Sequence, residues 1–150
     1  MEKALASTLS IMMNLVLLNI AVFLSTLSLH EMGHVVVGMY TGCESGKVIL
    51  YDSGQPGPYA ELMCSSGVDE RFALGGSLLA TTVFGSLFLF LRDSPQRNLF
   101  FVIIGFGIFF GSLDIVMITG IVMMQYVFIV FGMLLIIIGE FLTGLAYAET

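Results

Sequence analysis

The chain has 150 residues, of which 57% are hydrophobic and only 11% are charged, and its mean hydropathy is +1.01. Soluble domains carry about 25% charged residues, so this composition excludes most soluble folds and predicts an integral membrane protein surrounded by lipid. The length predicts a single domain over residues 1–150. The net charge of −6, with five basic residues, argues against nucleic acid as a partner.

The first predicted helix covers residues 4–40 and is apolar almost throughout. About 20 residues suffice to cross the hydrocarbon core, so a helix of this length must tilt or project beyond the bilayer. It lacks the short apolar region and small-residue cleavage site of a secretory signal peptide. We therefore expect this segment to remain in the mature protein.

Residues 41–71 form the one extended region predicted to be non-helical. The stretch 47–51 is a strand candidate rich in β-branched residues, and the stretch 52–58 is dense in turn residues. A β-hairpin and a plain surface loop fit this pattern equally well. A hairpin would offer a free edge that could pair with an extended peptide.

Cys43 and Cys64, the two cysteines of the chain, also lie in this region. A disulfide or a shared metal ion would use both thiols. Their spacing matches no zinc motif, and we interpret them as two unrelated thiols.

Three further spans are predicted over residues 72–91, 98–119 and 126–147. Many small residues in the second span favour close packing between neighbouring helices. The break between the third and fourth spans is placed either at Thr119 and Gly120 or at Gln125 and Tyr126. The predicted fold is thus an all-α membrane protein with about four transmembrane helices and a short β-hairpin or loop after the first helix.

The pattern H-E-x-x-H occurs once, at residues 30–34, and contains the only two histidines of the chain. On a helix, positions four residues apart lie on the same face, so His30 and His34 can bind one metal ion. Glu31 is placed to take a proton from a water on that metal. The pattern predicts a metal site with a neighbouring general base inside the first helix.

A catalytic zinc site needs a third protein ligand, and the later spans hold two carboxylates deep in apolar sequence, Asp114 and Glu140. The third span reaches Asp114 about 17 residues, or roughly 25 Å, after the 92–97 turn. This places Asp114 at the depth of the two histidines. The fourth span turns back, which places Glu140 toward the opposite face, so we predict Asp114 as the third ligand.

With these residues in place, the sequence resembles the site-2 protease family of intramembrane zinc metalloproteases. The family pattern H-E-x-G-H matches residues 30–34, and its L-D-G pattern begins like Leu113 and Asp114. The resemblance covers about residues 7–119. It implies Zn²⁺ held by His30, His34 and Asp114, Glu31 as the catalytic base, and a membrane-associated β-hairpin that helps to align the substrate.

The sequence departs from the family pattern in three places. Ile115 follows Asp114 where the family usually has glycine, and the prolines and asparagine that often precede L-D-G are absent. The second span reads G-G-S-L-L-A from Gly75 where the family has G-P-x-x-N. The resemblance therefore supports the ligands and the base, and it assigns no residue that stabilises the oxyanion.

The predicted function is hydrolysis of a peptide bond in or near a transmembrane segment of another membrane protein, with the substrate held extended against the 47–51 strand. One alternative is a catalytically inactive relative that binds and regulates membrane proteins. A zinc transporter or sensor is disfavoured, because transport needs polar residues across both leaflets and the ligands here are confined to one.

Membrane orientation follows from the resemblance alone. Basic residues number three on the side of Lys3, Arg92 and Arg97 and two on the side of Lys47 and Arg71, which decides little. The family usually places its metal site toward the cytosol. That choice predicts a multi-pass protein with its active site in the cytosolic leaflet and both cysteines in a reducing compartment.

Overall fold

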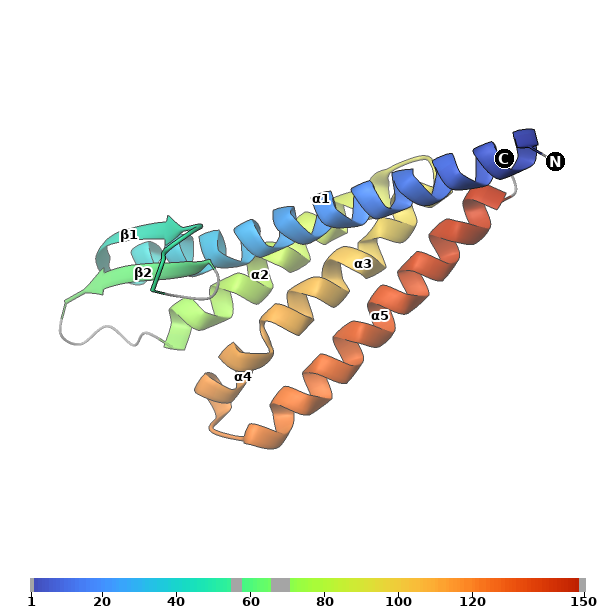
Figure 1. The fold of residues 1–150 in the computed structure, drawn as a ribbon. Coiled ribbons are helices and arrows are strands. Elements are labelled where there is room, and N and C mark those ends of the chain that lie inside the picture. The colour runs from blue at the N-terminus through green and yellow to red at the C-terminus, as the bar shows by residue number, and fades with distance from the viewer. Residues whose placement is uncertain (1, 55–57, 66–70, 149–150) are drawn as a thin grey trace.

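A computed structural model describes residues 2–54, 58–65 and 71–148, and these are mostly helical. Figure 1 shows long helices lying lengthwise beside one another, with a small two-stranded hairpin beside the C-terminal end of the first helix. The elements in chain order are α1 (Glu2–Tyr40), β1 (Cys43–Ile49), β2 (Tyr59–Cys64), α2 (Arg71–Leu87), the 3₁₀ turn η1 (Phe88–Phe90), α3 (Ser94–Phe110), α4 (Ser112–Thr119) and α5 (Val122–Ala148).

Two of the described helices are long and apolar enough to cross a membrane, over Met12–Tyr40 of α1 and Val122–Tyr147 of α5. The number rises to three if α3 and α4 are counted as one bent span, whereas the apolar stretch Gly75–Phe90 is shorter. Large apolar side chains are exposed along these helices, as lipid contact would require. Among the most exposed are Leu17, Val36, Met123, Val130 and Ile137.

Helices α1 and α2 cross with their backbones in contact at Gly33 and Gly76. A methyl group added to Gly33 would lie 2.7 Å from the carbonyl carbon of Gly76 and 2.8 Å from the Cα of Ser77. Only glycine allows this approach. The glycine inside the H-E-x-G-H pattern thus sets the distance between the helix that carries the histidines and its neighbour.

The third predicted span is a broken helix. Helix α3 ends at Phe110, α4 starts at Ser112, and the two axes differ in direction by 46°. Helix α4 then ends at Thr119 because Gly120 has a φ of 72°, which favours glycine. Of the two predicted breaks between the third and fourth spans, the one at Thr119 and Gly120 is therefore confirmed.

The core of the helix bundle lies away from the hairpin. Its fully buried side chains, Val102 and Ile103, come from α3 and pack with Leu99 and with Val22 of α1. Helix α5 runs along α3, where Gly132 lies close to the backbone of α3 at Phe109. Helix α3 therefore packs against both α1 and α5.

The region after α1 is an antiparallel hairpin, so of the two predicted alternatives the hairpin is confirmed. Its first strand begins at Cys43 and ends at Ile49, which is earlier than the predicted 47–51, because pairing with β2 continues back to the end of α1. Asp52 to Gly54 form part of the predicted turn. The rest of that turn, at 55–57, lies outside the described residues.

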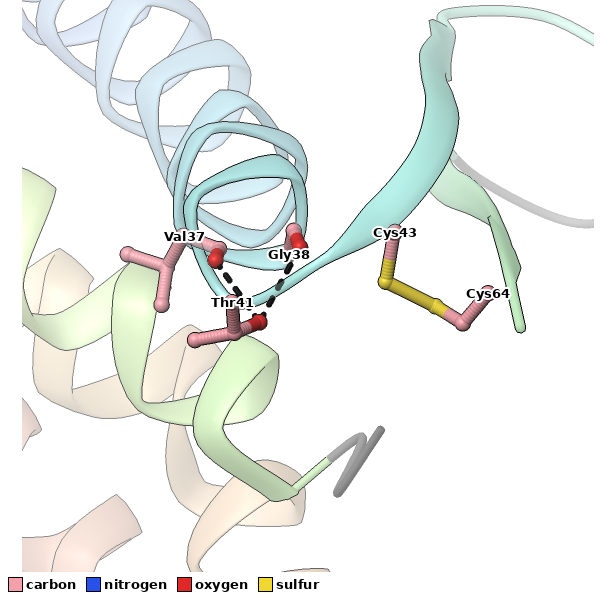
Figure 2. The surroundings of a disulfide bond; sticks show 5 residues. All are labelled: Val37, Gly38, Thr41, Cys43 and Cys64. Atoms are coloured by element: carbon pink, nitrogen blue, oxygen red, sulfur yellow. Dashed lines mark hydrogen bonds between the residues drawn. A yellow bond between two sulfur atoms is a disulfide. The ribbon is translucent and has the colours of Figure 1, made fainter. Parts of the chain in front are cut away.

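The interpretation of the two cysteines as unrelated thiols is wrong. The register of the hairpin places Cys43 opposite Cys64, and the two form a disulfide. Figure 2 shows this bond beside the last turn of α1, where the hydroxyl of Thr41 donates to the carbonyl oxygens of Val37 and Gly38. The disulfide thus ties β2 to the strand that leaves α1.

Candidate metal centre

His30 and His34 lie one turn apart on α1, as their spacing predicts, and both are buried. Their ring centroids are 5.0 Å apart, and the ring of Phe110 lies 6.0 Å from that of His30. Both Nε2 atoms face the same carboxylate.

That carboxylate belongs to Asp114, the residue chosen from sequence by its depth. Its Oδ2 atom lies 3.2 Å from Nε2 of His30 and 3.4 Å from Nε2 of His34. One ligand atom from each residue lies within 4.8 Å of the other two, and all three side chains are buried. The group could hold a metal ion. Glu140 lies outside it, half-buried on α5, where the adjacent Gly139 packs against Val102.

The break between α3 and α4 positions Asp114 in the first turn of α4. Gly111 joins the two helices and lies against the side chain of Leu78 on α2, where an added methyl group would lie 2.6 Å from Cδ2. A straight continuation of α3 would carry residue 114 along a different direction. The bend is therefore part of how the carboxylate reaches the histidines.

Ser77 is a member of the site that the sequence did not reveal. It is fully buried on α2, and its hydroxyl donates to Oδ2 of Asp114 at 2.9 Å. In the sequence it is one of many small residues in an apolar span, and its only distinguishing signal is its place directly after Gly76, where α1 and α2 touch. The same oxygen of Asp114 thus faces two imidazoles and one hydroxyl.

Glu31 points to the hairpin rather than to lipid. It is 9% exposed, and its carboxylate accepts a hydrogen bond from the backbone N–H of Ala60 in β2. A backbone N–H in a strand points to one side only, so the free edge of β2 lies next to Glu31. The sequence predicts a substrate held against the 47–51 strand, but the strand beside Glu31 is β2.

A cavity of about 410 Å³ adjoins these groups. Its polar wall is formed by the two histidines, Glu31 and Asp114, and the hairpin contributes Tyr59, Ala60 and Leu62. The remaining wall is apolar and comes from the α3–α4 region, with Phe110, Leu113 and Met117. A volume of this size accommodates a short stretch of extended peptide or a small molecule.

The hydroxyl of Tyr59 is anchored outside the helices. It donates to Oδ2 of Asp52 at 3.0 Å, and the backbone N–H of Gly54 donates to Oδ1 at 3.1 Å. The Gly54 N–H and then the tyrosine hydroxyl hold the pKa of Asp52 below its ordinary value. The same carboxylate raises the pKa of Tyr59, because the phenol is a donor in this hydrogen bond.

The donor set fits a metal ion of the transition series. Two imidazole nitrogens and one carboxylate oxygen form a three-ligand set that leaves room for a water or substrate atom. Nδ1 of His30 is buried without a hydrogen-bond partner among the described residues, so one polar atom of that ring is unsatisfied.

Comparison with family models, with curated proteins and with solved structures finds no match to this chain.

Proposed function

We propose that the protein is an intramembrane zinc metalloprotease of the site-2 protease type. The observation that carries this proposal is the convergence of His30 and His34 of α1 with Asp114 of α4, at a cavity that Glu31 also lines. An H-E-x-x-H pattern that arose by chance would have no reason to meet a buried carboxylate from a distant segment. A cavity bordered by a strand edge supports a peptide substrate.

The proposal places the chain in the membrane as a multi-pass protein with four crossings. Helices α1 and α5 each have the length for one crossing, and α3 with α4 provides a bent third. The fourth is α2 with η1, which packs against α1 and α3 and is shorter than a standard span. Broken and short helices are tolerated where they are buried in protein or line a cavity.

Zinc is the proposed ion because it favours two imidazoles, one carboxylate and one open position. When bound, it lowers the pKa of a coordinated water and polarises the scissile carbonyl. His30, His34 and Asp114 would hold the ion, and in the structure Nε2 of each histidine already lies close to Oδ2 of the aspartate. The hydroxyl of Ser77 donates to the same oxygen of Asp114 and would help to hold the carboxylate in place.

Glu31 is the proposed general base and acid. It takes one proton from the attacking water as the water oxygen bonds to the scissile carbonyl carbon. It then passes that proton to the amide nitrogen as the C–N bond breaks, which yields a carboxylate product and an amine product. Before substrate arrives, the carboxylate of Glu31 is held by the N–H of Ala60.

The proposed substrate is a transmembrane segment of another protein that unwinds locally. A helical substrate buries its carbonyl groups in its own hydrogen bonds, so the scissile bond must first become extended. The free edge of β2 beside Glu31 offers backbone groups to such a strand. The proposal therefore uses β2 as the docking edge, and not the 47–51 stretch.

The disulfide bears on membrane orientation. The resemblance implies that the metal site faces the cytosol, but disulfides persist in oxidising compartments and are rare in the cytosol. Cys43 and Cys64 lie at the hairpin, on the metal-site side of the helices. We therefore favour the orientation in which this end faces the oxidising compartment and the 92–97 turn faces the cytosol. A reporter domain fused into that turn, active only on one side, tests the assignment.

The function is tested on purified protein in three forms: wild type, Glu31→Gln and Asp114→Ala. Metal content is measured by mass spectrometry after purification without chelators and after adding zinc back. Proteolysis is measured in liposomes on tagged single-pass peptides that carry glycine and proline at different depths. Wild type should bind one zinc per chain and cut a subset of the peptides.

The two variants separate the roles of the residues. Glu31→Gln should keep its zinc and lose cleavage, and Asp114→Ala should lose both. Glu140→Gln is the matched control, because it alters a carboxylate of α5 that lies outside the cavity, and it should behave as wild type. Cleavage by Glu31→Gln would refute the mechanism. Wild type that binds zinc but cuts no peptide would favour the inactive relative.

A further inference from the structure

Two buried polar atoms on the same face of α1 lack hydrogen-bond partners among the residues that the structure describes. They are Oγ1 of Thr26, a residue with 0% exposure, and Nδ1 of His30. An unsatisfied polar group in an apolar interior costs about 1–3 kcal/mol, so such atoms are rare without a reason. Here the two lie one helical turn apart.

The geometry of a helix places these two side chains on one face, one turn apart. Residues four apart are stacked along the axis with their Cβ atoms about 5–6 Å apart. Long and aromatic side chains lean toward the N-terminal end of the helix, so the ring of His30 leans over the turn that carries Thr26. The Nε2 end of the same ring reaches Asp114.

The chemistry of a metal ligand decides which nitrogen carries the proton. A neutral imidazole has one donor and one acceptor nitrogen, and a metal at Nε2 uses the acceptor. Nδ1 must then carry the hydrogen and needs an acceptor of its own. Histidines that bind metals nearly always donate this second N–H to a neighbouring group, which fixes the tautomer and the ring orientation.

We propose that Thr26 is the positioning residue for His30. Its Oγ1 accepts the hydrogen bond from Nδ1–H when Nε2 binds the metal, and its own hydroxyl hydrogen is then directed to the carbonyl of Val22, one turn further along α1. The inference rests on the proposed metal site. It gives His30 a hydroxyl partner on α1, as Asp114 has one in Ser77 on α2.

The test compares Thr26→Val, which keeps the shape and loses the hydroxyl, with Thr26→Ser, which keeps the hydroxyl. Thr143→Val is the matched control, since Thr143 is equally buried but bonds the carbonyl of Gly139 on α5. Zinc affinity is measured in detergent by competition with a chromophoric chelator. Thr26→Val should bind zinc about 10- to 100-fold more weakly, and the other two variants should match wild type.

A second readout reports the tautomer directly. The chain has only two histidines, so long-range ¹H–¹⁵N spectra of zinc-loaded protein resolve both rings. In wild type and Thr26→Ser the His30 ring should show a proton fixed on Nδ1 in slow exchange with water, and in Thr26→Val this proton should exchange faster.

The outcomes separate this inference from the proposed function. If Thr26→Val binds zinc as tightly as wild type and its Nδ1 signal is unchanged, Thr26 does not position His30. The metal site itself would still stand, because wild type binds zinc. Equal weakening in Thr143→Val would also overturn the role of Thr26, because loss of any buried hydroxyl would then suffice. Wild type that binds no metal overturns both proposals.

Discussion

Removing the hydroxyl of Ser77 tests how far the aspartate ligand depends on its neighbour. Ser77→Ala deletes a single buried donor, 2.9 Å from Oδ2 of Asp114, and leaves the backbone contact of α2 with α1 in place. Removing a hydrogen-bond partner of a metal ligand typically weakens metal binding about 10- to 100-fold, which corresponds to about 1.4–2.8 kcal/mol. We therefore expect zinc affinity to fall about 10- to 100-fold.

The assay is chelator competition at one fixed pH, with thermal unfolding of the metal-free protein measured alongside. Ser86→Ala provides the control on the same helix, because that hydroxyl bonds the carbonyl of Thr82 and lies away from the cavity. It should leave zinc affinity unchanged. If Ser77→Ala binds zinc as tightly as wild type, the reasoning is refuted, because the carboxylate of Asp114 would then keep its position without the hydroxyl.

Two further changes probe the helix crossing and the hairpin. Gly33→Ala should lower the melting temperature, because the added methyl group would lie 2.8 Å from the Cα of Ser77 and such overpacking costs about 1–3 kcal/mol. An unchanged melting temperature would show that α1 and α2 can move apart without cost. Asp52→Asn should lower the pKa of Tyr59 toward its ordinary value, measured by NMR titration of the ring. In the unaltered chain, folding lowers the pKa of Asp52. The ionised carboxylate therefore stabilises the hairpin fully at a pH above the ordinary carboxyl pKa, and this stabilisation is lost as the pH falls through the lowered pKa of the folded state. The amide signal of Gly54 should report this loss on acidification, and a signal that does not move would contradict it.

The features predicted well from sequence are those set by periodicity and by rise per residue. The spacing of His30 and His34 fixes their common face on any helix, and counting residues along the third span placed Asp114 at their depth. The end of α1 at Tyr40 and the break at Gly120 follow from local chemistry. All of these depend on neighbours in the chain or on simple helix geometry.

The features that escaped prediction depend on contacts between distant segments. Ser77 is significant only because Gly33 lets α2 approach α1, which no single segment reveals. The disulfide follows from the register of the hairpin, and register depends on both strands together. The spacing of Cys43 and Cys64 in the sequence is equally compatible with two free thiols, so pairing could not be deduced from it.

The disulfide also affects how readily the hairpin can receive a partner strand. An isolated two-stranded hairpin is only marginally stable in water, and its disorder would have to be overcome at each binding event. A cross-link between residues 21 positions apart reduces the conformational entropy of the open hairpin, a contribution of about 3 kcal/mol in the loop-closure model. The edge of β2 is thereby preorganised. Most of the conformational entropy that the hairpin loses on ordering is lost during oxidative folding, before any substrate binds. Reduction should accordingly weaken substrate binding, seen as a higher KM, more than it slows the bond-breaking step.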